Sequence, residues 1–237
     1  MRVSLACLVG ISLTCLGTAS MAAGPEQLDQ LEPCRGAWQT EYFGTVSKSD
    51  ENEQALEAMY GVNDRLAVGI EIEGEYSNGA LAFETMAAKA LYRLTPPNAA
   101  IGAGLQLQFG FDDKVSLAEV EAQFIVEAQG ESWWSQANLM LRRSAEDDRS
   151  DISGAYAWSV QRSVGGLAWL GLEGSGNWGR TSCDERCEHH SHFVGPSLTI
   201  ELEHGEGTET EIGLAAFRST SASNVHSLAR LFIQVTF

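Results

Sequence analysis

The densest group of potential metal ligands lies between Cys183 and His192. It holds two cysteines four positions apart and three histidines within four residues. Thiolates and imidazoles bind zinc and copper, so His189, His190 and His192 are the candidate metal ligands. In an oxidising compartment, however, Cys183 and Cys187 would close a small disulfide loop that the histidines merely decorate. Composition favours the disulfide over the metal site, and we expect no cofactor.

A second group of ionisable residues recurs at alternate positions and would therefore share one face of a sheet. The residues expected on this face are Arg65, Glu71, Glu73, Glu75, Lys89, Arg93, Glu119, Glu121, Glu127, Arg142, Glu173, Glu201 and Arg230. Such a face must meet water, counter-charges or both. Carboxylates outnumber bases in this set, so an aqueous path that they line would favour cations, whereas mutual pairing would plug a narrow barrel.

The other histidines give little support to catalysis. His204 lies in an expected turn and His226 at the edge of an expected loop, and neither accompanies a Ser-His or Asp-His signature. Each is better explained as a surface histidine. We therefore expect that the protein is not an enzyme.

The elements that would position these charges are strands of about nine to thirteen residues. Between Ile101 and Phe111, and again between Ala118 and Gln129, apolar residues alternate with glycine, glutamine or glutamate. The stretch Leu81 to Leu94 alternates less regularly, which indicates a bulge. Two weaker strands near the start, Ala37 to Phe43 and Gln54 to Tyr60, bring the count to about twelve. This pattern predicts an all-β, transmembrane, antiparallel up-and-down β-barrel.

Three segments follow from composition and hydropathy. Residues 1–23 have the charged, apolar and small-residue order of a signal peptide, and residues 24–36 form a polar arm that we expect in the periplasm. Residues 37–237 would form the barrel. The formal charge of −17 disfavours nucleic acid as a partner.

An even strand number would place both the N-terminus and the C-terminus of the barrel on the periplasmic side, as single-chain bacterial barrels require. The longer and more polar connections then fall outside the cell. Eight strands give a barrel filled by side chains and sixteen leave a channel, so twelve is the ambiguous size. We lean to an open path because many inward positions are glycine or alanine.

The last strand supports this interpretation. Leu231, Ile233, Val235 and Phe237 fall on one face of this strand, and the sequence ends on an aromatic residue. Arg230, Gln234 and Thr236 fall on the other face. This stretch resembles the closing strand of bacterial outer-membrane β-barrels, whose terminal aromatic residue is read by the barrel-assembly machinery. The resemblance implies a Gram-negative outer-membrane location, lipid contacts, and an assembly signal at Phe237.

Shorter motifs at Tyr60 to Gly69, Leu91 to Leu94 and Val194 to Leu198 are similar to proteobacterial barrels of the phenol-degradation-pathway transporter type. The hairpin Glu73-Gly74-Glu75 also resembles copper-resistance outer-membrane proteins. The first resemblance implies uptake of small organic solutes. Our functional hypothesis is a passive channel or small-solute transporter with an acidic, cation-favouring lumen. The alternative is a non-conducting structural or surface-interaction barrel with a salt-bridged, plugged lumen.

Overall fold

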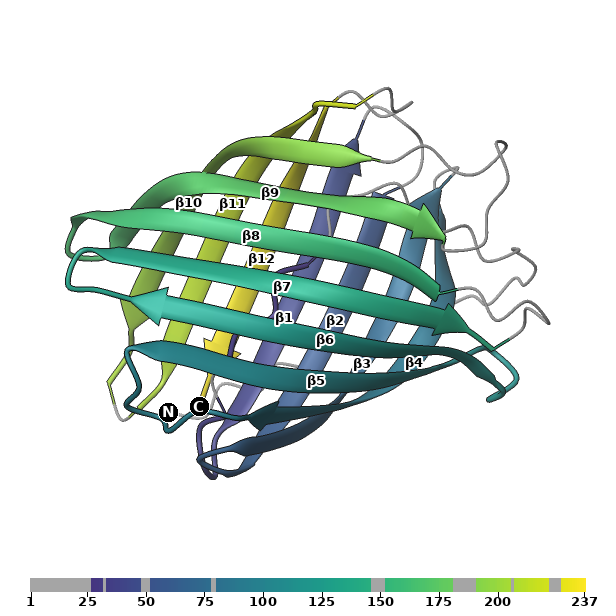
Figure 1. Ribbon diagram of the computed structural model, residues 1–237, viewed down its shortest axis with the longest axis horizontal. Helices are drawn as coiled ribbons and strands as arrows, with labels where there is room; N and C mark the ends of the chain where they lie inside the picture. Colours follow the sequence, from purple (N-terminus) through teal and green to yellow (C-terminus); the bar gives the residue numbers. More distant parts are fainter. Residues whose placement is uncertain are drawn as a thin grey trace, which may run out of the picture.

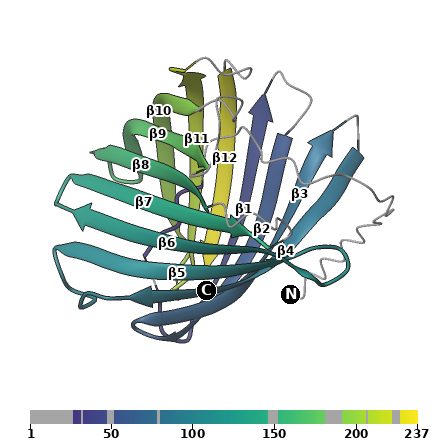
Figure 2. The ribbon, with the colours of Figure 1, turned by 45° about the vertical axis from the view of Figure 1, so that its right-hand side comes forward.

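The computed structural model describes residues 27–31, 33–47, 52–77, 80–145, 152–180, 191–205, 207–221 and 227–237. In this part of the chain, twelve antiparallel strands close into one barrel. Figures 1 and 2 show the strands winding obliquely around a shared interior. The predicted up-and-down barrel of about twelve strands is therefore confirmed. No helix among the described residues is long and apolar enough to cross a membrane.

Each strand pairs with its neighbours in the sequence. The strands are β1 (Trp38–Ser47), β2 (Asn52–Asn63), β3 (Leu66–Ser77), β4 (Ala80–Arg93), β5 (Ile101–Phe111), β6 (Leu117–Gln129), β7 (Trp133–Ser144), β8 (Ile152–Gly165), β9 (Ala168–Arg180), β10 (His192–Glu203), β11 (Glu209–Ser219) and β12 (Ser227–Thr236).

The barrel closes between β1 and β12. The N–H of Trp38 donates to the carbonyl of Phe237 at 2.8 Å, and the N–H of Phe237 donates to the carbonyl of Trp38 at 2.9 Å. The start of β1 and the end of β12 therefore lie at the same end of the barrel. Closure pairs the two strands that would otherwise be sheet edges, which satisfies their backbone groups without water.

Side chains alternate between an apolar outer face and a polar inner face. In β5, Ile101, Leu105 and Leu107 are exposed on the outside, while Gly104 and Gln106 are buried inside. Period-two alternation produces this result wherever the strand is regular. Several large aromatic residues lie on the exposed outer surface, as in the aromatic girdles of outer-membrane barrels: Trp38, Tyr76, Tyr92, Trp133 and Phe237.

Two local features adjust the regular ladder. The register of β3 against β4 shifts between Glu73 and Gly74, which pair with Thr85 and Phe83. This shift confirms the bulge predicted between Leu81 and Leu94. The β8–β9 hairpin turns through Gly165 and Gly166, whose φ angles of 132° and 52° lie in a region that favours glycine.

Candidate functional site

The candidate site is the inner surface of the barrel, where charged side chains meet across the lumen. The most contacted base is Lys89 of β4. Its Nζ lies 3.1 Å from Oε2 of Glu71 and 3.4 Å from Oδ1 of Asp29, and it also contacts the carboxylate of Glu57. The Lys89 and Glu71 side chains are only 2% and 4% exposed. One ammonium group therefore faces three carboxyl groups.

A second ion pair joins strands that are not neighbours. Arg230 of β12 contacts the carboxylate of Glu173 of β9, and both side chains are buried. The guanidinium also lies 5.9 Å from the ring centroid of Phe43 and 5.2 Å from that of Phe217. Cation–π contacts of this kind add to the ion pair in holding the guanidinium in place. The pair therefore fixes a base and an acid on the wall from β9 to β12.

Two further bases face the lumen. Arg142 of β7 contacts the carboxylate of Glu121 and lies 4.0 Å from that of Glu119. Arg93 of β4 donates from Nη1 to the carbonyl oxygen of Leu31 at 2.7 Å. The partner of Arg93 thus belongs to the chain before the first strand.

Residues 27–31, which we name the lumen segment, lie inside the barrel. The Asp29 carboxylate accepts hydrogen bonds from Gln106 at 2.9 Å and from Lys89 at 3.4 Å. The Asp29 carbonyl accepts from Gln136 and, at 3.2 Å, from Asn138. Strands β4, β5 and β7 therefore converge on a single residue of the segment.

The rest of the lumen segment is held on both sides. Gln27 donates to Glu41 at 2.8 Å, and Gln30 donates to Glu211 at 3.0 Å. The N–H of Leu31 donates to Oε1 of Glu127 at 2.5 Å. These contacts reach β1, β11 and β6, so the segment crosses the lumen rather than following one strand.

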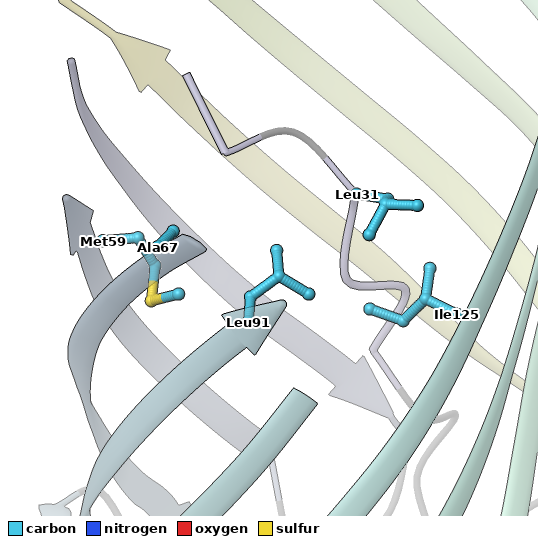
Figure 3. Packing of buried hydrophobic residues seen from close by; sticks show 5 residues of the cluster. All are labelled: Leu31, Met59, Ala67, Leu91 and Ile125. Carbon is cyan, nitrogen blue, oxygen red and sulfur yellow. The ribbon is translucent and has the colours of Figure 1, made fainter. Parts of the chain in front are cut away.

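The side chain of Leu31 fills an apolar hole in the wall. Leu31 is fully buried and clusters with Met59, Ala67, Leu91 and Ile125, which Figure 3 shows around it. Inward glycines make this approach feasible. A Cβ added to Gly104 would lie 2.2 Å from Cδ1 of Leu31, too close for a real contact.

A small cavity remains beside the lumen segment. It offers about 20 Å³ to water, which is enough for one or two molecules. Its lining comes from the lumen segment and from strands β1, β7, β8, β9, β11 and β12, and it includes Glu41, Glu173, Glu211 and Arg230. This cavity therefore lies between the lumen segment and the wall opposite β4 to β6.

Most of the predicted inward charges lie on the inner face. Glu71, Glu73, Glu75, Lys89, Arg93, Glu119, Glu121, Glu127, Arg142, Glu173, Glu201 and Arg230 occupy inward positions of their strands. Arg65 differs: it lies in the exposed turn between β2 and β3, because β3 begins one residue later than the alternation suggested. Its N–H donates to Oδ1 of Asn63, as in a tight turn.

The candidate disulfide and metal ligands are mostly outside the described residues. This is true of Cys183, Cys187, His189 and His190. His192 is described, and it begins β10 with its Nδ1 2.9 Å from the Tyr156 hydroxyl. Among the described residues, no group of three histidine, cysteine, aspartate or glutamate residues is arranged to hold a metal ion.

The lumen segment and its inner-wall partners were not predicted from the sequence. Asp29 and Leu31 belong to a stretch for which only a polar arm was expected. Gln106 was recognised as facing inward, but the position of its partner was not. No local signal marks these contacts, because the hydrogen bonds of Asp29 and Leu31 join residues from 60 to 109 positions apart, as between Asp29 and Lys89 or Asp29 and Asn138.

An apolar outer band around a charged inner wall is the arrangement of outer-membrane β-barrels. No known family model and no curated protein matches the chain. Solved structures do match. An outer membrane channel from Pseudomonas putida F1 has a TM-score of 0.60 at 14% identity, over 89% of this chain and 99% of that one.

Two porins are also similar. The NanC porin has a TM-score of 0.57 at 8% identity, over 84% of this chain and 98% of its own. The KdgM porin, solved in complex with disordered oligogalacturonate, has a TM-score of 0.53 at 8% identity over the same shares. At these identities the likeness establishes the fold alone, a closed antiparallel β-barrel of the kind found in these outer-membrane channels and porins. The general resemblance to outer-membrane β-barrels is thereby confirmed, while the phenol-degradation and copper-resistance resemblances stay predictions.

Proposed function

We propose that this chain is a passive outer-membrane channel for small solutes, with a lumen that favours cations. The observation that carries the proposal is the imbalance of charge on the inner wall. Lys89 faces Asp29, Glu57 and Glu71 at once, and Glu41 and Glu211 border the cavity in addition to the paired Glu173. A water-containing path with this lining would concentrate cations and repel anions.

The fold supports the same proposal. The similar solved barrels are channels and porins, which agrees with the expectation that this chain is not an enzyme. Fold similarity alone does not transfer a solute, so the proposal names only the class of solute that the charges would admit.

A second candidate, a non-conducting barrel with a plugged lumen, is favoured by one specific observation. The lumen segment crosses the interior and leaves a cavity of only about 20 Å³ beside it. Ion pairs such as Arg230 with Glu173 add to this filling. A barrel that stayed closed in this way would act through its surface instead.

Reversal potentials in planar bilayers under a potassium chloride gradient separate the two candidates. We expect the parent protein to conduct, with a cation-to-anion permeability ratio above one that falls as salt rises and the Debye length shortens to about 10 Å at 0.1 M. A variant with Glu41→Gln and Glu211→Gln should conduct comparably but with a ratio closer to one. Glutamine can still accept the hydrogen bonds that Gln27 and Gln30 donate to these two residues.

The matched control is Glu131→Gln, which alters an exposed residue in the connection between β6 and β7. It should leave the permeability ratio unchanged. Absence of conductance from correctly inserted parent protein would favour the plugged barrel, and anion preference would contradict the charge argument.

We also infer that residues 1–23 are removed as a signal peptide and that the N- and C-termini of the barrel both face the periplasm. Phe237 would then serve as the assembly signal. Support comes from the outer-membrane fold and from the exposed position of Phe237 at the end of the closing strand. Removal of Phe237 should reduce the amount of barrel in outer-membrane fractions, whereas an unchanged amount would contradict the assigned role.

A further inference from the structure

The inner wall holds part of the lumen segment in the way that a binding site holds a ligand. Asp29 and Leu31 precede β1 and are joined to it through residues 32–37. Their contacts are nevertheless with strands β2 to β7, far along the chain. The recognition therefore depends on groups in the wall and not on the covalent link to β1.

The wall recognises the backbone of the segment. Side chains from β7 donate to the Asp29 carbonyl, Glu127 of β6 accepts from the Leu31 N–H, and Arg93 of β4 donates to the Leu31 carbonyl. Backbone groups are the same in any peptide, so an unconnected peptide can make the same hydrogen bonds. Hydrogen bonds that involve a charged side chain are among the stronger ones.

The wall also distinguishes two side chains. The Asp29 carboxylate is placed between Lys89 and Gln106. Two residues later, Leu31 enters the apolar hole whose depth depends on the absence of a side chain at Gly104. The intervening Gln30 points to the opposite wall, where it meets Glu211 and Gln234.

We propose that this part of the inner wall is a peptide-binding site for short, extended peptides that carry an acidic residue two positions before an aliphatic one. The chain's own lumen segment occupies the site in the described state. The proposal deepens the proposed function by naming a class of ligand for the lumen, and it rests on that function only for the ligand's access to the site.

The chain's own lumen segment competes with a free peptide for the site and therefore lowers the apparent affinity of that peptide. A tethered ligand acts at an effective concentration of about a millimolar for a short flexible linker. An added peptide would therefore bind the parent protein weakly. Weakening the lumen segment should expose the full affinity of the site.

The test uses full-length protein with Asp29→Ala and Leu31→Ala, together with a fluorescent acetyl-Gln-Leu-Asp-Gln-Leu-amide peptide. Fluorescence anisotropy should show that the variant binds the peptide at least about tenfold more tightly than the parent protein, since the competing segment is weakened. Peptides with asparagine for aspartate, or with alanine for the second leucine, should each bind at least about tenfold more weakly, because each loses one of the two side-chain contacts.

Substitutions in the wall of the same variant give a second test of where the peptide binds. Adding Gly104→Ala to the variant should abolish binding, because the new methyl group occupies the position of the leucine side chain. Adding Gly110→Ala should not, because its nearest neighbour is Cβ of Glu119 at 3.6 Å, an ordinary contact. Equal binding of all peptides, or equal binding by parent and variant, would overturn the proposal.

Binding is read here without any current, so the two proposals can fail separately. A barrel that binds the peptide but never conducts would support the peptide-binding site and contradict the channel function. A cation-preferring channel that binds all the peptides alike would support the channel function and contradict the peptide-binding site.

Discussion

The inner faces of β4–β7 and of β8–β11 differ in the size of their side chains. The first, which we name the polar half, carries long residues such as Lys89, Arg93 and Gln106. The second, the small-residue half, carries some large residues such as Gln161, Glu173 and Phe217 but has more glycine, alanine and hydroxyl residues on its inner face: Ala155, Ala157, Ser159, Gly171, Ser175, Gly195, Ser197, Thr199, Gly213 and Ala215.

The two halves also differ in how their polar groups are satisfied. In the polar half, charged and amide groups reach the lumen segment or one another, and the buried atoms without a partner among the described residues are Arg93 Nε, Gln123 Nε2 and Gln136 Oε1. In the small-residue half, the hydroxyl groups of Ser175, Ser197 and Thr199 are buried and have no partner among the described residues. Buried hydroxyl groups of this kind are usually satisfied by water. Strand number alone therefore does not decide whether a barrel is filled, because side-chain size differs around one wall.

The largest expected effect is the loss of Lys89 from the polar half. Lys89→Met would leave Glu57 and Glu71 buried around a missing cation. Removing one partner of a buried ion pair costs about 3–5 kcal/mol. The free energy of unfolding, measured by urea titration in lipid vesicles, should fall by that order.

The control for this prediction is Lys114→Met in the exposed turn after β5, which should stay within about 0.5 kcal/mol of the parent. A triple variant that adds Glu57→Gln and Glu71→Gln should recover part of the loss, because no uncompensated carboxylate remains at those two positions. Equal stability of Lys89→Met and Lys114→Met would show that the cluster is not a structural element of the polar half.

An intermediate effect is expected from a single methyl group in the polar half. Gly104→Ala should displace Leu31, with which its Cβ would collide, at a cost of about 1–3 kcal/mol. Limited proteolysis should then cut the N-terminal segment faster than in the parent protein. Gly110→Ala on the same strand has room for its Cβ and should be cut at the parental rate; equal rates for both variants would contradict the assigned packing of Leu31.

The smallest effects are expected in the small-residue half. Ser197→Ala removes a hydroxyl group without a partner among the described residues and should change the free energy of unfolding by less than about 0.5 kcal/mol. Ser159→Ala removes an acceptor that Gln161 uses at 3.2 Å and should cost about 1 kcal/mol. A larger loss for Ser197→Ala than for Ser159→Ala would mean that the hydroxyl groups of this half are satisfied within the chain.

The barrel could be predicted from the sequence because its signal is local. Alternation in stretches such as Ile101–Phe111 and the irregular stretch after Leu81 report the ladder and its bulge directly. The inward charges followed from the same alternation. Arg65 was misplaced because a strand boundary depends on turn chemistry at Asn63, which alternation does not detect.

The contents of the lumen could not be predicted in the same way. Inward glycines such as Gly104 indicate space, but the sequence does not say what fills it. Here Leu31 fills part of it, from 73 positions earlier in the numbering. That inward glycine and alanine leave an open path stays a prediction, because the lumen segment occupies part of the same space.

The central claim has two parts. The polar half holds the lumen segment across the lumen, and the rest of the inner wall lines a polar path that favours cations. Single-channel conductance of the parent protein and of the Asp29→Ala, Leu31→Ala variant tests it most directly. The variant loses the carboxylate between Lys89 and Gln106 and the side chain in the apolar hole. We predict that the variant has a larger conductance than the parent and still prefers cations to anions. A variant that inserts correctly yet conducts no more than the parent would contradict the account.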